Sequence, residues 1–456
     1  MHGLLQLFTL SSVPERHTDC IIKLMQQLFT RFDGHIQVQL WDGQRIHLGR
    51  QPAPLDGSPF TLIFRTPAIL MSFIKRRDPL SFAESYFKCD MDVEGDLAAL
   101  LALREQFNRL HIDWRVKTAG LLNALTMRFS KPLSVPHWQH SHFSTSKTVY
   151  RHTRSENRAS VQFHYDVSNA FYGLWLDPAM VYSCAYFSSP TQDLASAQTA
   201  KLDLICRKLQ LQPGDQFLDI GCGWGALVIY AARHYGVTAR GVTLSQKQYD
   251  YAQAQIKSAG LEARVTVHLQ DYRDIAGQAL FNKIASVGMC EHVGIKNIPV
   301  YLQTVRRLLT SNGLFLNHGI SSDTEGWPDN LGHTFVNRYV FPDGQLDTLS
   351  NLQRQMALAQ FEVLDVESMR AHYVLTLRHW IKQLAQQHAS ALHYVNEATF
   401  RIWLAYMTAS RLSFENGNLG LYQTLLCPRG ASPLPQPLTR RHMLTPHARQ
   451  PPNLVF

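Results

Sequence analysis

The sequence predicts an α/β fold in which a smaller α+β domain precedes a doubly wound parallel sheet. Three observations support this prediction. Strand-like and helix-like segments alternate from about residue 217 to residue 317, as a parallel sheet with crossover helices requires. A glycine-rich turn at residues 221–225 joins the first of these strands to a helix. The chain of 456 residues is also long enough to hold two domains.

The N-terminal domain is assigned to residues 1–124. Apolar and polar residues alternate at residues 35–40, which is typical of a half-buried strand. Residues 42–43, Asp-Gly, suit a hairpin turn that leads into a second strand at residues 45–48. Residues 60–64 form a third candidate strand. Short strands joined by turns indicate a small α+β module.

An apolar segment at residues 68–74 follows these strands and runs into three cations at residues 75–77. This pattern suits a core helix whose last turn carries charges that complement the helix dipole. It also suits an element that inserts into a membrane surface. Both interpretations remain open from the sequence.

The larger domain is assigned to residues 161–427. Helices are predicted at residues 226–234 and from the N-cap residue Ser245 to about residue 258. Five strands are predicted, at residues 217–220, 238–244, 265–269, 283–287 and 314–317.

Two segments have compositions that do not favour a packed core. Residues 125–160 carry cations such as Lys131, Arg151 and Arg158 but a single acid, Glu156, and are interpreted as a basic linker. Residues 428–456 are rich in proline and contain no acid, so a disordered tail is predicted there.

The charge balance indicates an anionic partner. A formal net charge of +9 and a pI near 9.2 suit either nucleic acid or a membrane surface rich in acidic lipid. No apolar run approaches the roughly 18 residues that a membrane-spanning helix needs. The N-terminus has no secretory signature, and the seven cysteines form no CxxC pair and no metal-like spacing with histidine. We therefore expect a cytoplasmic protein with reduced thiols and no bound metal.

The glycine-rich turn predicts a ligand site, because glycines between a strand and a helix let the backbone approach a ligand closely. A nicotinamide dinucleotide site would carry an acid about 20 residues further on. Here the next strand ends in Thr243, Leu244 and Ser245, with Gln248 one turn later and no carboxylate among them. This difference argues against a dinucleotide.

These motifs resemble those of the cyclopropane-fatty-acyl-phospholipid synthases, a family of class I S-adenosylmethionine (SAM)-dependent methyltransferases with a Rossmann-like sheet. The resemblance extends over about residues 160 to 426. It implies SAM as cofactor and a set of cofactor-binding residues from four motifs: Tyr182, Ser183, Asp219, Gly221, Cys222, Gly223, Thr243, Leu244, Ser245, Gln248, Asp271, Tyr272 and Arg273.

The same resemblance implies a bound bicarbonate ion that serves as the catalytic base. Its ligands would be the side chains of Glu291, His318 and Tyr373 and the main chain of Cys184 and Ile320. An isolated Glu or His at a sheet edge is more often a solvated loop residue. The catalytic assignment of Glu291 and His318 rests on several such residues occurring together and on the resemblance. The sequence also departs from the family pattern beside His318: Asn stands at 317, where an apolar residue is expected, and Gly at 319, where Thr is expected.

The segment around Tyr182 is unusually aromatic. By itself such a cluster is more often a buried core than a cofactor contact. Aromatic faces can nevertheless stabilise a sulfonium or a carbocation in a dry pocket. Both interpretations remain open from the sequence.

The predicted activity is methylene transfer from SAM to the cis double bond of an unsaturated phospholipid acyl chain. The products would be a cyclopropane fatty acid and S-adenosylhomocysteine (SAH). Alternatives are methyl or methylene branching of the same alkene, and a non-catalytic lipid-binding protein.

Residues 82–86 and 92–96 resemble the lipid-binding N-terminal domain of longer family members. The expected partners are therefore unsaturated phospholipids at the inner face of the membrane, with peripheral attachment. No nucleic-acid recognition motif occurs, so nucleic acid is not expected as a partner. The sequence leaves homodimer formation open.

Overall fold

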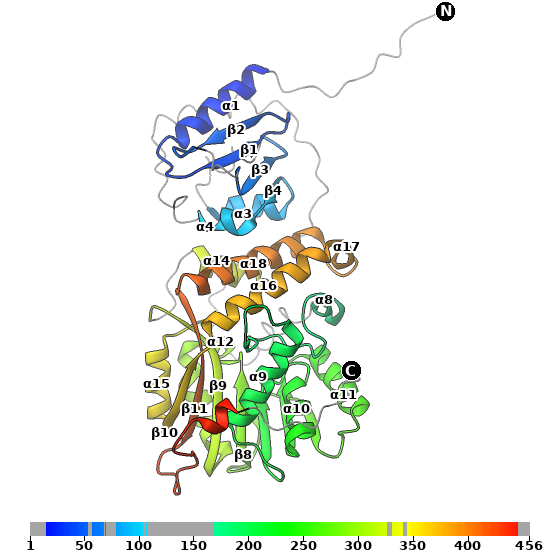
Figure 1. Cartoon of the computed structure of the whole chain (residues 1–456), viewed down its shortest axis with the longest axis vertical. Helices are drawn as coiled ribbons and strands as arrows, with labels where there is room; N and C mark the ends of the chain where they lie inside the picture. The colour runs from blue at the N-terminus through cyan, green and yellow to red at the C-terminus, as the bar shows by residue number, and fades with distance from the viewer. Residues whose placement is uncertain are drawn as a thin grey trace, which may run out of the picture. The chain divides into compact units, whose positions relative to one another are not determined.

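The computed structural model describes residues 15–52, 57–67, 69, 79–103, 106, 168–325, 331–340 and 344–445. The chain divides into two compact units, Met1–Ser141 and His142–Phe456, which Figure 1 draws in one colour ramp. The predicted linker and, apart from Ile69, the apolar segment at residues 68–77 lie outside the described residues.

The N-terminal unit contains a four-stranded sheet in the order β2-β1-β3-β4. β1 pairs antiparallel with β2 and parallel with β3, and β3 pairs antiparallel with β4. The three predicted strands and the hairpin turn are confirmed, whereas α1, α3, β4 and α4 were not predicted. The elements are α1 (Glu15–Leu28), β1 (Ile36–Gln39), β2 (Arg45–Leu48), β3 (Phe60–Phe64), α3 (Pro79–Phe87), β4 (Met91–Gly95) and α4 (Leu97–Ala102).

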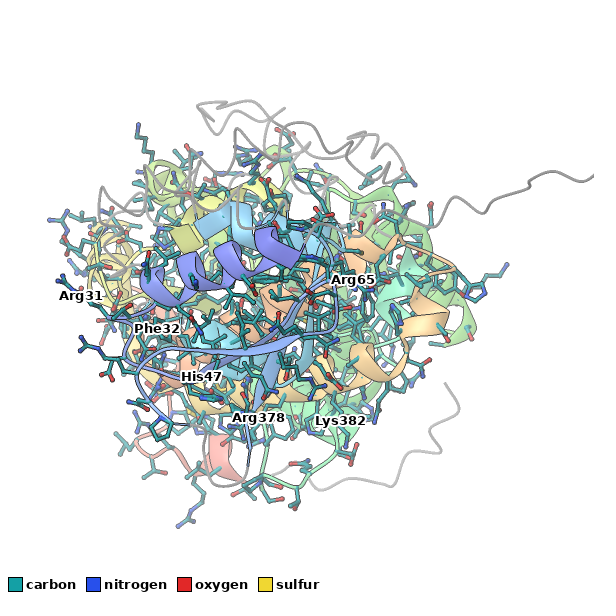
Figure 2. The ribbon with its side chains drawn as sticks, turned by 90° about the horizontal axis from the view of Figure 1, so that it is seen from above. Arg31, Phe32, His47, Arg65, Arg378 and Lys382 are labelled. Carbon is teal, nitrogen blue, oxygen red and sulfur yellow. The ribbon has the colours of Figure 1, made fainter. Side chains whose placement is uncertain are left out.

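The core of this unit follows from the alternation of side chains along its strands. Ile36 and Val38 of β1 are fully buried, and Phe60 and Leu62 of β3 lie in the same cluster. Phe32, which precedes β1, is also buried, whereas its neighbour Arg31 is exposed and points outward (Figure 2). One face of the sheet therefore packs on the helices, as period-two alternation predicts.

The larger unit is built on a seven-stranded sheet in the order β10-β11-β9-β8-β5-β6-β7. The five predicted strands are confirmed as β5 to β9, and they pair in parallel. β11 runs antiparallel between β9 and β10, so the sheet is mostly parallel. The strands are β5 (Gln216–Ile220), β6 (Thr238–Thr243), β7 (Val265–Leu269), β8 (Phe281–Val287), β9 (Leu309–Ser322), β10 (Phe361–Ser368) and β11 (Leu419–Pro428).

Helices cover both faces of this sheet. Phe217 of β5 packs in a cluster with α9, α10 and α11, while its neighbour Leu218 packs in another with α13 and α15. This is the doubly wound arrangement that the sequence predicts. The helices are α8 (Asn169–Gly173), α9 (Leu194–Lys208), α10 (Ala226–Tyr235), α11 (Gln246–Ser258), α12 (Cys290–Val293), α13 (Ile298–Leu308), α14 (Leu331–Tyr339), α15 (Leu349–Leu358), α16 (Arg370–Gln386), α17 (His388–Ala391), α18 (Glu397–Glu415) and α19 (Arg441–Leu444), with 3₁₀ turns at Tyr272–Asp274 and Ile295–Asn297.

The order of strands reverses at β5, because the chain proceeds from β5 to β6 and β7 on one side and to β8 and β9 on the other. In open α/β sheets, ligands bind outside the carboxyl ends of the strands at such a reversal. The topology therefore places the candidate site at the ends of β5, β6 and β8.

The start of the Pro-rich tail differs from the prediction of disorder. Residues 428–445 pack on the larger unit: Met443 is buried in a core cluster with α9 and α10. Arg440 pairs with Asp365 of β10 at 2.5 Å, and the Gln210 side chain donates to the Pro435 carbonyl at 2.8 Å. These few contacts hold residues 428–445 on the surface of the larger unit, although this segment could not form a core alone. Residues 446–456 lie outside the described residues.

Within the described part of the chain, no helix combines the length and the apolar character needed to cross a bilayer.

Candidate active site

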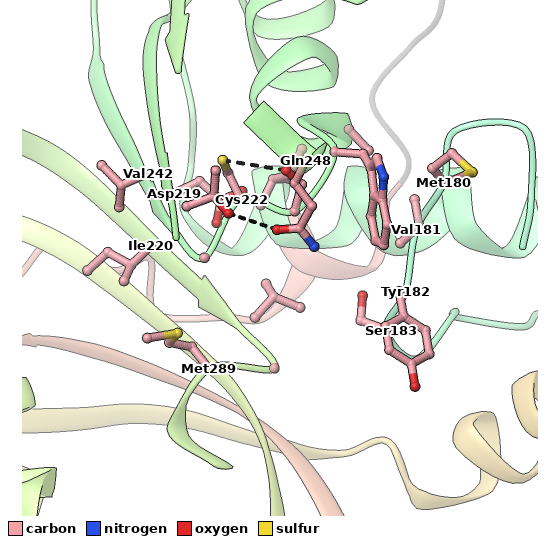
Figure 3. A pocket seen from close by; sticks show the side chains of 18 of the residues that line it. Met180, Val181, Tyr182, Ser183, Asp219, Ile220, Cys222, Val242, Gln248 and Met289 are labelled. Carbon is pink, nitrogen blue, oxygen red and sulfur yellow. Dashed lines mark hydrogen bonds between the residues drawn. The ribbon is translucent and has the colours of Figure 1, made fainter. Parts of the chain in front are cut away.

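A pocket opens at the carboxyl ends of β5, β6 and β8 and encloses about 950 Å³, part of it open to solvent. Figure 3 shows Asp219, Cys222 and Gln248 on the sheet side of the pocket and Tyr182 and Ser183 across from them. The glycine turn and the segment from Thr243 to Gln248 therefore meet the upstream aromatic segment at one site.

The glycine turn shapes the floor of this pocket. Gly221 and Gly223 both line it and have positive φ angles of 82° and 54°, which glycine adopts without steric cost. The backbone N–H groups of Gly221 and Cys222 both donate to the Val242 carbonyl at 3.0 Å. A Cβ atom at Gly241 would lie 2.7 Å from Cys222 Sγ, so a glycine on β6 lets the turn pack against that strand.

The segment from Thr243 to Gln248 positions polar groups without a carboxylate. The Thr243 hydroxyl donates to Gln248 Oε1 at 2.7 Å, and Thr243, Leu244 and Gln248 line the pocket. Ser245 is fully buried and caps α11, because its Oγ accepts from the Gln248 N–H at 3.4 Å. Ser245 is not among the lining residues and acts here as the start of the helix.

Of the predicted residues Asp271, Tyr272 and Arg273, Tyr272 lines the pocket. Asp271 and Arg273 instead form a bidentate ion pair with each other, with N–O distances of 2.9 and 2.6 Å. This pairing raises the pKa of Arg273, and its guanidinium lies 5.7 Å from the centre of the Tyr272 ring. The pair thus supports the turn that presents Tyr272.

The upstream aromatic segment is both a core and a pocket wall. Phe171, Tyr172 and Trp175 are fully buried, as the core interpretation predicts. The Tyr182 ring packs against Tyr172 and Trp175 with centroid distances of 5.6 and 5.4 Å, and Tyr182 lines the pocket. The cluster therefore holds a rigid aromatic face toward the ligand.

Glu291 lies on the short helix α12 after β8, between Met289 and His292, which line the pocket, and is not itself a lining residue. Its side chain is 8% exposed, and its Oε1 accepts from the Ile320 backbone N–H at 2.7 Å. Burial raises the pKa of Glu291, and the Ile320 N–H partly opposes that shift. Two of the predicted catalytic residues are therefore in direct contact.

His318 stands two residues before Ile320 on β9, so both side chains point to the same face of the sheet. It is 1% exposed, and burial holds its pKa well below the usual range, so the ring is neutral. Its Nδ1 is 3.1 Å from the amide nitrogen of Gln423 on β11. Its Nε2 is buried and has no hydrogen-bond partner, which leaves one ring nitrogen available to a ligand.

Tyr373 and Cys184 lie in the same aromatic cluster as Ile320. Tyr373, on α16, packs on Phe414 with a ring separation of 4.8 Å. The Cys184 thiol is buried and donates to the Ala185 carbonyl at 3.2 Å, and burial raises its pKa. The thiol is therefore unsuited to nucleophilic chemistry. The main-chain role of Cys184 stays a prediction.

Sequence reasoning missed several lining residues, namely Lys201, Trp224, Gln270, Met289 and His292. A signal for Lys201 was present. It stands one helical turn after Ala197 and one turn before Ile205, both of which are fully buried, so periodicity places it on the apolar face of α9. Trp224 belongs to the glycine turn and donates to Asn169 Oδ1 at 2.9 Å.

The departures beside His318 have a structural explanation. Asn317 is buried, and its Oδ1 accepts from the Tyr301 hydroxyl at 3.1 Å, so the polar side chain has a partner. A Cβ atom at Gly319 would lie 2.2 Å from Cys290 Sγ. The glycine is therefore required by the cysteine that precedes Glu291.

Comparison with known proteins gives the family. The model of the mycolic acid cyclopropane synthetase family matches residues 152–424, which is more than half of the chain. The chain belongs to this family. A second model, of a domain of unknown function, matches residues 23–109 of this cyclopropane synthetase family member.

Curated relatives of this family member include both methyltransferases and cyclopropane synthases. A probable fatty acid methyltransferase of Pseudomonas putida is 36% identical over 392 residues, covering 86% of this chain and 91% of the relative. The cyclopropane-fatty-acyl-phospholipid synthase of Escherichia coli K12 is 36% identical over 313 residues, covering 68% of this chain and 76% of the relative.

Solved structures agree with the fold of this family member. The cyclopropane synthase MmaA2 from Mycobacterium tuberculosis superposes with a TM-score of 0.56 at 32% identity, over 59% of this chain and 97% of that one. The mycolic acid cyclopropane synthase CmaA1, solved with SAH and CTAB, gives the same values. The chain is therefore a SAM-dependent methyltransferase, and the glycine-turn pocket is its candidate cofactor site.

Proposed function

We propose that this enzyme transfers a methylene group from SAM to the cis double bond of an unsaturated phospholipid acyl chain, forming a cyclopropane fatty acid. The observation that carries the proposal is the buried Glu291, held by the Ile320 N–H beside a histidine whose Nε2 has no partner. Ile320 belongs to the same cluster as Tyr182, and Glu291 lies between Met289 and His292, which line the cofactor pocket. The likeness to the E. coli cyclopropane synthase supports the same activity.

The chemistry explains why such groups are needed. SAM, when bound, supplies an electrophilic methyl group on sulfur. An isolated alkene is a weak nucleophile, so the chain must hold the reactants close together and exclude water. Tyr182 and the rings packed on it provide a dry wall whose faces favour positive charge. Once the new C–C bond forms and SAH leaves, one proton must depart from the transferred methyl group for the ring to close.

We assign that base to a bicarbonate ion held by the side chains of Glu291, His318 and Tyr373 and the main chain of Cys184 and Ile320. The neutral His318 ring fits this role. Its buried Nε2 has no hydrogen-bond partner, and when this nitrogen carries the ring proton it can donate to a bound anion. The Ile320 N–H already donates to Glu291, so contact with the anion would require these two acceptors to share one donor.

Methyl or methylene branching is the second candidate. It is favoured by the P. putida relative, whose name specifies a fatty acid methyltransferase, and by the unusual Asn317 and Gly319 beside His318. Family membership as a SAM-dependent methyltransferase argues against the third hypothesis, a non-catalytic lipid-binding protein.

The product of the full-length enzyme separates these candidates. The enzyme is incubated with SAM and vesicles of a cis-unsaturated phospholipid, and the extracted fatty acids are analysed by mass spectrometry and proton NMR. Ring formation adds one CH₂ and gives the high-field proton signals of a cyclopropane. A branched product that lacks those signals would refute the cyclopropane proposal.

We further propose that the enzyme acts from the cytoplasmic side as a peripheral membrane protein, with unsaturated phospholipids as partners, and that nucleic acid is not a partner. The net charge of +9 supports attraction to anionic headgroups.

We expect binding of the full chain to anionic vesicles to weaken as salt rises, because attraction of about 1 kcal/mol per nearby Lys or Arg is screened. Cosedimentation with vesicles at low and high salt measures this effect, and neutral vesicles are the control. Salt-independent binding, or equal binding to both vesicle types, would contradict an electrostatic attachment. Addition of an oligonucleotide to the anionic vesicles tests whether nucleic acid competes.

A further inference from the structure

A buried lysine in the cofactor pocket has no role in the mechanism above. Lys201 projects from α9, is 2% exposed and lines the pocket. Its ammonium group donates to the Ser183 hydroxyl oxygen at 2.8 Å. A lysine in such a place needs a compensating interaction, because an ammonium group loses much of its hydration when it is buried.

A buried carboxylate faces the same pocket. Asp219 ends β5, is 3% exposed and lines the pocket, and its Oδ1 has no hydrogen-bond partner. Lys201 and Asp219 affect each other through space and not through a hydrogen bond. The pocket therefore contains the Lys201 ammonium and the Asp219 carboxylate, which do not hydrogen-bond to each other and can each bind a ligand.

The direction of the hydrogen bond from Lys201 decides what Ser183 can do. Lysine has three donors and no acceptor, so the Ser183 oxygen must accept. The serine proton is then free to point elsewhere, which makes Ser183 a donor toward a ligand. Lys201 and Ser183 together thus offer only donors, whereas Asp219 offers only acceptors when ionised.

A wall of donors beside a separate acceptor complements a zwitterion. The amino-acid end of SAM is such a group, since it carries a carboxylate and an ammonium on one carbon. We propose that Lys201 is a positioning residue that orients the Ser183 hydroxyl and, with its own charge, fixes the carboxylate of the cofactor, while Asp219 receives the ammonium. The inference rests on SAM binding and not on the lipid product.

The charge states of the two groups are consistent with a site that is completed by its ligand. Burial lowers the pKa of Lys201 to about 8 and raises the pKa of Asp219 to about 7. A bound carboxylate beside Lys201 and a bound ammonium beside Asp219 would each favour the ionised form of their neighbour.

Isothermal titration calorimetry with SAM and with decarboxylated SAM tests this role, because the two ligands differ only in the carboxylate. We expect the wild type to bind SAM roughly 10- to 100-fold more tightly, as for a hydrogen-bonded charge. Lys201→Met should remove most of that preference by weakening SAM binding while leaving the decarboxylated ligand nearly unaffected. Equal weakening of both ligands would show that Lys201 is only structural and would overturn the proposal.

Lys208→Met is the matched control. Lys208 lies on the same helix and is also buried, but it pairs with Glu367 at 2.6 Å and does not line the pocket, so the preference should survive. If Lys201→Met does not fold, Ser183→Ala removes the oriented hydroxyl without touching a charge. Full retention of the carboxylate preference by Ser183→Ala would then overturn the proposal. Because binding is measured without lipid, a failure here is distinct from a failure to form cyclopropanes.

Discussion

Glu291→Gln is expected to abolish most turnover while leaving cofactor binding intact. Glutamine has the same shape and its carbonyl can still accept from the Ile320 N–H, so the local structure should persist. In the proposed mechanism, what is lost is a carboxylate oxygen that accepts the hydrogen bond of the bicarbonate O–H group and so holds the base. Contributions of this kind amount to about 10²–10⁴-fold in rate. Methyl transfer from labelled SAM to unsaturated vesicles measures the loss, and calorimetry with SAH measures cofactor binding.

Glu362→Gln provides the control for this experiment. Glu362 is exposed on the edge strand β10, which β11, β9 and β8 separate from β5 in the sheet. It should transfer methyl groups at the wild-type rate. If Glu291→Gln also retained the wild-type rate, the proposed role of this carboxylate would be wrong. If it lost SAH binding and turnover together, the residue would belong to cofactor binding instead.

Gly319→Ala is expected to destabilise the larger unit by about 1–3 kcal/mol, the usual cost of overpacking a core. The added Cβ would lie 2.2 Å from Cys290 Sγ, and both positions are on buried elements that carry Glu291 and His318. Urea unfolding of the wild type and the variant measures the change in free energy. Activity should fall as well, because Cys290 cannot move without shifting Glu291.

The cause is tested by a double-mutant cycle with Cys290→Ala. Removal of the sulfur makes room for the methyl group, so Gly319→Ala should cost much less in that background. Gly173→Ala is a steric control, since its nearest contact, Met180 Sδ, would be 3.9 Å away. An equal cost of Gly319→Ala with and without Cys290 would disprove the steric explanation.

Much of the fold could be predicted because its signals are local. Each strand from β5 to β9 contains a short apolar stretch and lies between helical segments, and the glycine turn marks where the first strand ends. The unpredicted β4, Met-Asp-Val-Glu-Gly, has a weaker pattern, since it carries two acids in five residues. The unpredicted α1 is strongly amphipathic, so its periodicity could have been recognised in the sequence. The packing of residues 428–445 depends on a surface made by distant segments, which composition does not reveal.

The candidate site was predictable to the extent that its residues occur in contiguous motifs. The glycine turn, the Thr243–Gln248 pair and Glu291 belong to such motifs. Gln423 could not be assigned in this way, because its contact with His318 exists only through the pairing of β11 with β9. The division of labour between Tyr272 and the Asp271–Arg273 pair also depends on side-chain geometry.

The late position of β11 has a consequence for biosynthesis. β9 leaves the ribosome about a hundred residues before the strand that will lie beside it, since Gln423 and His318 are 105 positions apart. Until then the hydrogen-bonding edge of β9 has no β11 to pair with, and an open edge of this kind invites wrong partners. A nascent chain that stops before residue 419 lacks β11, the strand that pairs with both β9 and β10. His318 therefore gains its contact with the Gln423 amide only as translation nears its end.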